Sequence, residues 1–321
     1  MDLLSIVIPV YNEEEILPRL FPALVEAFDK VDRLSFEVIL VNDGSRDRSW
    51  EIMKEQHRKD PRFRMICFSR NFGHQMALTA GIDRARGDAV VVMDADLQDS
   101  PAVVLEMVKE WRNGHDIVYG QRHERLGESW FKLLTAKWFY RTINFLSRDK
   151  TPENVGDFYL LSRRAVERLK SMRESHRYLR GMIFWIGFEP KAVLYRREAR
   201  AAGTTKFPFR KMFRFAVDGI VSSSTLPLNM ASYLGFASAF VGFLTSLWVV
   251  FTKIYKEQVI SGWASLSIIV LFMGGIQLIS VGIVGLYLAR IYDEVRRRPL
   301  YIVREELLGE EASMSSSAET K

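Results

Sequence analysis

Two carboxylates, separated by one residue, follow a short apolar run. Residues 89–93 read Ala-Val-Val-Val-Met, which is typical of a buried strand, and Asp94 and Asp96 come directly after them. A bare carboxylate is costly to bury unless a cation accompanies it. A helix start explains the next residues, Asp99–Pro101, with Asp or Ser as N-cap and Pro at the first helical position, but it leaves Asp94 and Asp96 unexplained. We therefore predict a divalent metal site that holds a phosphorylated ligand.

The residue types around this pair restrict the metal. Carboxylate and amide oxygens, such as those of Asp96 and Gln98, are ligands for hard cations like Mg²⁺ or Mn²⁺. The sequence has one cysteine, Cys67, and its five histidines show no ligand spacing, so we predict no zinc site. Gln98 by itself is equally consistent with an ordinary surface residue. Cys67 lies in an apolar run and is expected in the core.

The elements that position these residues alternate between strand and helix patterns. We expect strands at residues 5–10, 36–41, 64–68, 89–93 and 116–120. We expect helices at residues 13–28, from after Ser45 to about residue 59, at 74–85 and at 101–113. This alternation predicts an α/β fold with a mostly parallel sheet and helices on both faces. Ligands bind at the carboxyl ends of the strands in such sheets. Tyr11–Glu13, Asn42–Ser45 and Asp94–Asp96 all follow strand ends, which indicates one shared site.

The last third of the chain has a different composition. Residues 219–252 and 259–289 contain no Asp, Glu, Lys or Arg, and each stretch is long enough to cross the roughly 30 Å apolar core of a membrane as a helix. The alternative is a buried helical hairpin of a soluble protein, which two such stretches with a short connection disfavour. The first residues run directly into a strand pattern, so no signal peptide is expected.

The formal net charge of +6 is concentrated around these two stretches. Basic residues gather before the first stretch and after the second, whereas only Lys253 and Lys256 lie between them. By the positive-inside rule, both termini are expected in the cytoplasm and the short connection outside. The clusters flank membrane spans, so we do not predict nucleic acid as a partner.

Two aromatic and basic segments resemble helices that lie at a membrane surface. In residues 207–220, basic side chains fall on one helical stripe and apolar ones on its neighbour, which favours the interface over core packing. For residues 130–146, interface and core packing remain equally open. After Leu308 the chain is polar and rich in serine, and we expect it to be disordered.

Four segments, taken in order and spacing, resemble a known family. They are Ile8–Glu13, Val41–Ser45, Arg70–Gly73 and Asp94–Gln98. They resemble the family 2 inverting glycosyltransferases of GT-A fold, and within them the polyprenyl-phosphate type. This type includes the bactoprenol (undecaprenyl-phosphate) glucosyltransferases and the dolichol-phosphate mannosyltransferases. The resemblance covers residues 3–305; each motif alone is weak, but the ordered set is specific.

The resemblance implies roles for residues that bind the sugar donor. The nucleotide pocket would be lined by Pro9, Tyr11, Glu13 and Asp43, and Asp43 would contact the base. Asp94 would lie near the ribose or the metal, and Asp96 and Gln98 would bind the Mg²⁺ or Mn²⁺ ion that bridges the donor diphosphate. Arg122 would lie near the donor.

The resemblance also implies residues for the acceptor. The segment Arg200–Lys206 resembles a family loop that contacts phosphates, with Arg200, Thr205 and Lys206 as its candidates for the acceptor phosphate. Arg200 is alternatively one more determinant of membrane orientation. Asp157 matches the family more loosely and would either orient the acceptor or act as a base. The expected catalytic residues are Asp96, Asp157, Arg200 and Lys206.

These implications combine into a domain plan. We expect a cytoplasmic GT-A catalytic domain at residues 1–205, an amphipathic juxtamembrane helix at 206–228, membrane helices at 229–253 and 262–290, and a cytoplasmic tail at 291–321. The catalytic domain would lie on the inner face of the plasma membrane. The family also suggests homo-oligomers, with the tetramer as the expected state.

The implied activity is transfer of a hexose, with UDP-glucose as the favoured donor, to polyprenyl phosphate. Another nucleotide sugar, such as GDP-mannose, is the alternative donor. A processive polysaccharide synthase is disfavoured because the Gln-x-x-Arg-Trp motif is absent. A scaffold or flippase subunit without catalytic activity is a third possibility, which the intact Asp94, Asp96 and Gln98 disfavour.

Overall fold

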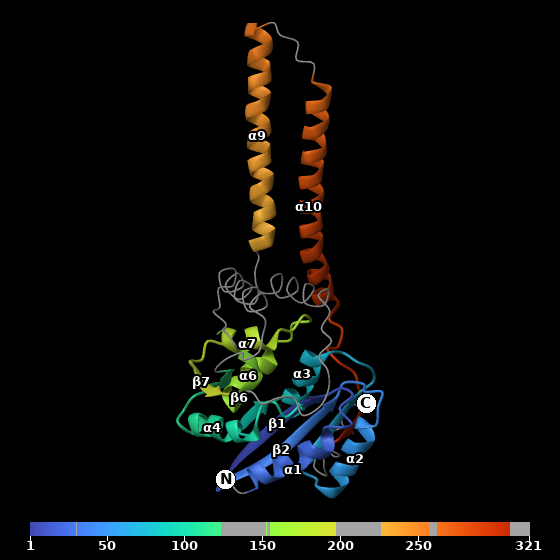
Figure 1. Cartoon of the computed structure of the whole chain (residues 1–321), viewed down its shortest axis with the longest axis vertical. Helices are drawn as coiled ribbons and strands as arrows, with labels where there is room; N and C mark the ends of the chain where they lie inside the picture. Colours follow the sequence, from blue (N-terminus) through green and yellow to red (C-terminus); the bar gives the residue numbers. More distant parts are fainter. Residues whose placement is uncertain (30, 123–151, 153–154, 197–225, 257–261, 309–321) are drawn as a thin grey trace, which may run out of the picture. The chain divides into compact units, whose positions relative to one another are not determined.

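The structure is a computed structural model, and it describes residues 1–29, 31–122, 152, 155–196, 226–256 and 262–308. The described residues form two compact units. The first contains all the strands and the shorter helices, and the second contains two long helices (Figure 1). The expected segments 130–146 and 207–220 lie outside the described residues.

A mixed sheet forms the centre of the first unit. Within the described residues it has eight strands in the order β7-β5-β6-β4-β1-β2-β3-β8. Their bounds are β1 Asp2–Val10, β2 Leu34–Asn42, β3 Phe63–Phe68, β4 Ala89–Val92, β5 Ile117–Arg122, β6 Val155–Ser162, β7 Pro190–Tyr195 and β8 Val303–Leu307. All neighbours are parallel except where β6 or β8 takes part. The prediction of a mostly parallel sheet is confirmed.

Helices cover both faces of this sheet (Figure 1). One face carries α1 (Leu17–Phe28), α2 (Ser49–Lys59) and α4 (Pro101–Arg112), and the other carries α3 (His74–Arg84), α6 (Arg163–Ser171) and α7 (Leu179–Trp185). Successive side chains of a strand point to opposite faces. Accordingly, Ile6 and Ile8 belong to one apolar core, while Val7 between them belongs to the other.

The start of α4 shows how local sequence fixes an element. Pro101 is its first residue, and Ser100 is its N-cap, because the Ser100 side chain accepts a hydrogen bond from the Ala102 N–H at 3.3 Å. The predicted helix start is confirmed. Asp99 does not cap the helix, and its carboxylate bonds to a distant strand instead.

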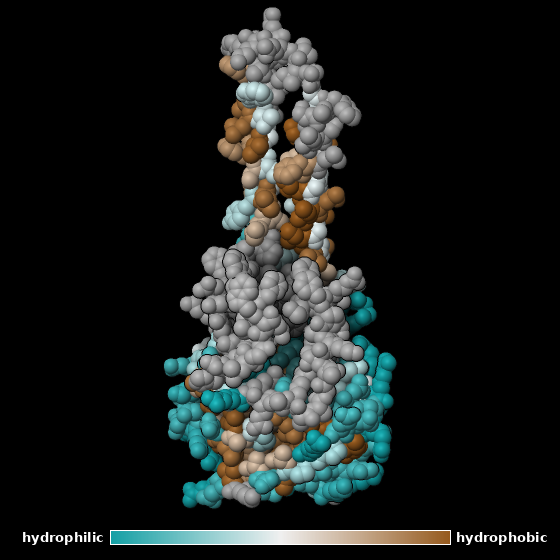
Figure 2. Space-filling view, in the orientation of Figure 1, coloured by the Kyte–Doolittle hydropathy of each residue, from teal (hydrophilic) through white to brown (hydrophobic). Residues whose placement is uncertain are grey.

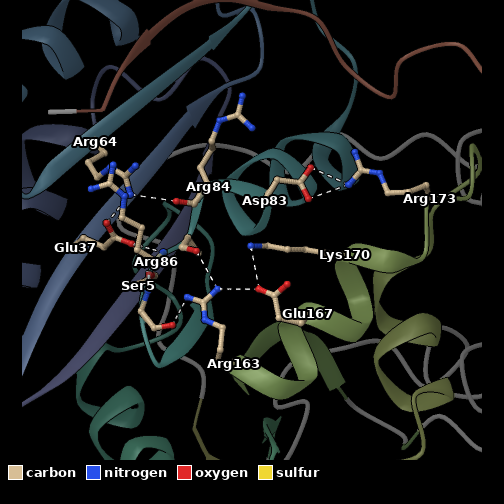
Figure 3. Close-up of polar contacts among 12 residues, drawn as sticks. Ser5, Glu37, Arg64, Asp83, Arg84, Arg86, Arg163, Glu167, Lys170 and Arg173 are labelled. Atoms are coloured by element: carbon tan, nitrogen blue, oxygen red, sulfur yellow. Dashed lines mark hydrogen bonds and ion pairs between the residues drawn. The ribbon is translucent and has the colours of Figure 1, made fainter. Parts of the chain in front are cut away.

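A buried ion pair ties the strands together near their amino ends. Arg64 Nη1 lies 2.5 Å from Glu37 Oε2, and both side chains are less than one-tenth exposed (Figure 3). Glu37 Oε1 also accepts bonds from the Ser5 hydroxyl at 2.5 Å and from the Arg86 N–H at 2.8 Å. The pair therefore joins three strands to the turn before β4, at the edge opposite the expected site.

Residues 291–308, which belong to the expected tail at 291–321, form the end of α10 and a strand. The helix α10 continues to Arg296, and β8 then pairs antiparallel with β3. Glu306 accepts a bond from Arg84 Nη2 at 2.8 Å, and the Tyr301 hydroxyl donates to Asp83 at 2.8 Å. The sequence Val-Arg-Glu-Glu-Leu lacks the alternation of a half-buried strand, which is why it gave no strand signal.

The second unit consists of α9 (Leu226–Lys256) and α10 (Trp263–Arg296), which pack on each other. Both are long and apolar enough to cross a membrane, by length and composition. α9 contains the whole expected span 229–253, and α10 contains all but the first residue of 262–290. Large apolar side chains such as Phe236, Phe272 and Leu278 are at least two-thirds exposed, and apolar residues gather along both helices (Figure 2). Exposed apolar surface on this scale indicates a membrane or a protein partner.

Candidate active site

The carboxyl ends of β1, β2 and β4 meet at one edge of the sheet. The Asp43 N–H donates to the Val10 carbonyl at 2.9 Å, and the Met93 N–H donates to the Val7 carbonyl at 3.1 Å. The polar segments that follow these three strands therefore start from neighbouring positions. This is the arrangement expected from the topology of a parallel sheet.

A clasp of hydrogen bonds holds the segment after β1 against the segment after β2. The Asn12 N–H donates to Ser45 Oγ at 3.0 Å, and Asn12 Oδ1 accepts from the Arg46 N–H at 2.8 Å. The Glu13 N–H donates to Ser49 Oγ at 2.9 Å. Next to this clasp the Tyr11 side chain remains 45% exposed. A rigid turn with an exposed aromatic ring suits a nucleotide, which is the role expected for Tyr11.

Asp43 holds the loop that precedes α3. It is 3% exposed, its Oδ1 accepts from the Phe72 N–H at 2.7 Å, and its Oδ2 accepts from the Gly73 N–H at 3.0 Å. Gly44 has a φ of +68°, and a side chain there would run into the backbone of Arg70. Burial raises the pKa of Asp43 above its usual value, although the two backbone hydrogen bonds oppose this. Its expected contact with a nucleotide base stays a prediction.

A histidine lies between two carboxylates at the centre of this edge. His74 Nε2 is 3.7 Å from Asp94 Oδ1 and 3.5 Å from Asp157 Oδ2. Asp94 follows β4, and Asp157 lies on β6, which pairs with β4 through Val92 and Tyr159. Burial lowers the pKa of His74, but its carboxylate neighbours outweigh this, and the net pKa is raised.

Sequence reasoning assigned no chemistry to His74. The signal that was available is its position directly after the Arg70–Gly73 motif, at the first residue of α3. Its two carboxylate partners lie far away in the sequence. Only the fold brings them within reach.

Asp157 receives further hydrogen bonds from three elements. Its Oδ1 accepts from Arg180 Nη2 at 3.0 Å and from the Tyr159 hydroxyl at 3.1 Å, and its Oδ2 accepts from Gln75 Nε2 at 3.0 Å. Burial raises the pKa of Asp157, but His74 and Arg180 outweigh it, and the net pKa lies far below the usual value. A carboxylate of low pKa is a poor proton acceptor. Between the two roles expected for Asp157, these contacts favour orientation over general base.

The segment after Asp94 forms a tight turn. Asp96 Oδ1 accepts from the Gln98 N–H at 3.1 Å, Leu97 has a φ of +56°, and Gln98 is 8% exposed. In the part of the chain that the structure describes, no group of three or more His, Cys, Asp or Glu residues is placed to hold a metal. A Mg²⁺ or Mn²⁺ ion in a nucleotide site needs only one or two carboxylates, because phosphate and water oxygens complete its shell.

The donor set here fits such an ion. Burial, reinforced by the neighbouring carboxylates, raises the pKa of Asp94 to about 6, despite the opposing charge of His74. A cation at this position would offset the cost of keeping Asp94 ionised.

Arg122 ends β5 beside the strand that carries Asp157. A side chain at Gly156 would meet Arg122 Nη2, so the guanidinium lies over this glycine. The expected acceptor residues Arg200, Thr205 and Lys206 lie outside the described residues, and their roles stay predictions.

Comparison with known proteins identifies the family. Residues 5–170 match Glycosyl transferase family 2. The Bacillus subtilis (strain 168) protein YkcC, an uncharacterized glycosyltransferase, is 45% identical over 301 residues, which cover 94% of this chain and 93% of that protein. The chain belongs to glycosyl transferase family 2. It is therefore a glycosyltransferase, as expected.

Two further relatives of this glycosyltransferase resemble nearly the whole chain. A bactoprenol glucosyl transferase of Shigella phage SfII is 39% identical over 302 residues, covering 94% of this chain and 97% of that protein. A prophage bactoprenol glucosyl transferase homolog of Escherichia coli (strain K12) is also 39% identical, over 301 residues, with coverage of 94% and 98%.

The fold of this glycosyltransferase is GT-A. It resembles the crystal structure of glucosyl-3-phosphoglycerate synthase from Mycobacterium tuberculosis in complex with Mn²⁺, UDP-glucose and phosphoglyceric acid. The TM-score is 0.50 at 17% identity, and the likeness covers 68% of this chain and 78% of that chain. At this identity the likeness concerns the fold alone. The predicted fold class is confirmed.

Proposed function

We propose that this glycosyltransferase transfers glucose from UDP-glucose to a polyprenyl phosphate, with inversion at the sugar and with a divalent metal. The main support for the lipid acceptor is the similarity to bactoprenol glucosyl transferases over 94% of the chain, which includes both long apolar helices. A polyprenyl phosphate is held in a membrane by its lipid chain, and helices long enough to cross a membrane would bring the enzyme to this substrate. UDP-glucose is the favoured donor for the same reason, and GDP-mannose is the alternative.

In this proposal the edge of β1, β2 and β4 holds the donor. Pro9, Tyr11, Glu13 and Asp43 line the nucleotide pocket, and Arg122 lies near the diphosphate. Asp94, Asp96 and Gln98 would hold Mg²⁺ or Mn²⁺, which stabilises the negative charge that develops on the leaving diphosphate.

The acceptor needs orientation more than deprotonation. A phosphate monoester has a second pKa near 6, so most of it is already a dianion at pH 7. The fixed carboxylate of Asp157, with His74 and Arg180 beside it, orients the reacting groups. Arg200, Thr205 and Lys206 bind the acceptor phosphate, with Arg200 and Lys206 opposing the repulsion between the two phosphate groups.

We further propose that the chain is a homo-oligomer, with the tetramer as the expected state, in the inner membrane. α9 and α10 span the membrane, and the catalytic unit and both termini are cytoplasmic. The excess of basic residues outside the connection between α9 and α10 supports this orientation.

The test uses the full chain, purified in detergent, with labelled UDP-glucose, undecaprenyl phosphate and Mg²⁺ or Mn²⁺. We expect a labelled lipid that mild acid cleaves, and loss of this product in Asp96→Ala. Preference for GDP-mannose would overturn the proposed donor. Metal-dependent label in a polymer would indicate a synthase, and no labelled product from any UDP- or GDP-sugar would contradict the proposed reaction.

A further inference from the structure

A tyrosine at one border of the described sheet reaches the turn that follows β4. β7 pairs with β5 and ends at Tyr195, and sequence reasoning assigned no residue of this strand to the site. The Tyr195 hydroxyl donates to Asp99 Oδ1 at 2.5 Å, and both residues are at most 5% exposed. Asp99 directly follows Gln98, a proposed metal ligand. The hydroxyl thus fixes one end of the turn that carries Asp96 and Gln98.

The same hydroxyl contacts a proposed donor residue. Arg122 Nε donates to the Tyr195 oxygen at 3.5 Å, and these two residues are partners in the register of β5 and β7. Burial, together with the charge of Asp99, raises the pKa of Tyr195, so the phenol stays protonated and keeps donating to Asp99. A tyrosine can donate one bond and accept another at once, whereas phenylalanine can do neither.

The ring of Tyr195 has a separate packing role. It makes an edge contact with Phe158, with 5.5 Å between ring centroids. It also lies close to Gly120, where a side chain would meet the ring. Phenylalanine would keep these contacts, so the contribution of the hydroxyl can be measured apart from that of the ring.

Two parts of the proposed site therefore join at one buried hydroxyl: the turn after Asp96, and Arg122.

We propose that Tyr195 is a positioning residue of the donor site, whose hydroxyl holds the Asp96–Asp99 turn and Arg122 in the arrangement that binds the metal and diphosphate of the nucleotide. This inference rests on the proposed function. Removing the hydroxyl takes one charge-assisted hydrogen bond away from the buried Asp99 carboxylate. The turn can then shift, and the affinity for the metal–nucleotide pair falls.

The test compares Tyr195→Phe with wild type in the full-length protein. We expect the Kd for UDP at saturating Mn²⁺ to rise about tenfold, since hydrogen bonds to charged groups contribute that much or more. The KM for UDP-glucose rises in parallel, whereas the KM for undecaprenyl phosphate stays unchanged. Calorimetric titration with UDP and Mn²⁺ measures the binding without turnover.

Tyr301→Phe is the matched control. It also removes a tyrosine hydroxyl that donates to an aspartate, Asp83 at 2.8 Å, but Asp83 lies at the opposite end of α3 from His74. We expect this variant to lower the unfolding temperature and to leave the Kd for UDP unchanged. Asp99→Asn weakens the Tyr195 bond from the other side, and we expect it to raise the Kd for UDP in the same direction. It also provides the test if Tyr195→Phe does not fold.

Unchanged UDP affinity in Tyr195→Phe and Asp99→Asn, with a loss of thermal stability like that of Tyr301→Phe, would overturn the positioning role. Asp96→Ala separates this failure from failure of the proposed function. If Asp96→Ala loses Mn²⁺-dependent binding of UDP while Tyr195→Phe keeps it, only the positioning role is wrong. If Asp96→Ala binds UDP and Mn²⁺ as wild type does, the proposed metal site is wrong.

Discussion

His74 separates two carboxylates that would otherwise face each other across β4 and β6. Burial raises the pKa of Asp94, and the charge of Asp157 adds to this rise, as expected of two carboxylates that repel each other. The imidazole between Asp94 and Asp157 reduces this repulsion in the ligand-free protein. A bound divalent cation would likewise reduce the repulsion on Asp94.

His74→Gln is therefore expected to destabilise the free protein more than the complex. We predict that the rise in unfolding temperature on adding Mn²⁺ and UDP is larger in this variant than in wild type, because the ion relieves the repulsion that His74 no longer relieves. Thermal denaturation with and without Mn²⁺–UDP measures this difference. His115→Gln, which alters a histidine beside Glu110 at 3.6 Å, should show the wild-type increment. Equal increments in all three proteins would contradict the idea.

Asp157→Asn distinguishes the two roles considered for this carboxylate. If Asp157 orients the reactants, the asparagine keeps the shape of the aspartate side chain but not its charge, and we expect kcat to fall by about tenfold. A general base contributes about 10²- to 10⁴-fold, and its loss would alter the pH dependence of kcat. Rates at saturating acceptor across pH 6 to 9 measure both effects. A loss of a thousandfold or more with a changed pH profile would favour the base.

At the scale of elements, the sheet depends on contacts that join strands distant in sequence. The ion pair of Arg64 and Glu37 links β3 to β2 and, through Ser5 and Arg86, to β1 and the turn before β4 (Figure 3). Breaking a buried pair leaves an uncompensated charge, which is far more costly than breaking an exposed pair.

Arg64→Met is accordingly predicted to lower the free energy of unfolding by about 3 kcal/mol or more, because Glu37 remains buried without its cation. Arg62→Met removes ion pairs to Asp29 and Asp60 in which the Arg62 side chain is 40% exposed, and it should cost about 1 kcal/mol or less. Denaturant unfolding of both variants tests the contrast. Similar losses would show that the buried pair has no special role.

β8 is predicted to be part of the catalytic unit in solution. Deleting residues 303–321 removes the pairing with β3 and the Arg84–Glu306 ion pair, and it exposes the edge of β3. We expect the free energy of unfolding to fall by on the order of 3 kcal/mol, which lowers the unfolding temperature by roughly 10 °C. Deleting residues 309–321 alone should leave the unfolding temperature unchanged. Equal stability of the two truncations would exclude a structural role for β8.

At the scale of the whole molecule, the proposed topology places the connection between α9 and α10 outside the cell. We predict that a cysteine at Gln258, in a Cys67→Ala background, reacts with an impermeant maleimide on intact cells. A cysteine at Ser315 should react only after permeabilisation. The reverse pattern would invert the proposed topology, and labelling of both positions only after permeabilisation would contradict a transmembrane hairpin.

The sequence by itself determined the features that depend on neighbouring residues. Hydrophobic periodicity located the strands and helices of the first half, the Ser100-Pro101 pair marked the start of α4, and the charge-free stretches located α9 and α10. These signals are local because propensity, capping and periodicity act over a few residues. The polar segments after β1, β2 and β4 were also predicted to share one edge of the sheet, and the fold brings their starting points together there.

Only the tertiary structure decided which side chains complete that edge. Gln75 meets Asp157 from 82 residues away, and Tyr195 meets Asp99 from 96 residues away. Away from this edge, Arg84 meets Glu306 from 222 residues away. No pattern in the sequence connects such partners, since their contact depends on strand order and on the antiparallel insertion of β6 and β8. His74 and Tyr195 therefore gave no signal alone: their chemistry arises from the neighbours that the fold supplies.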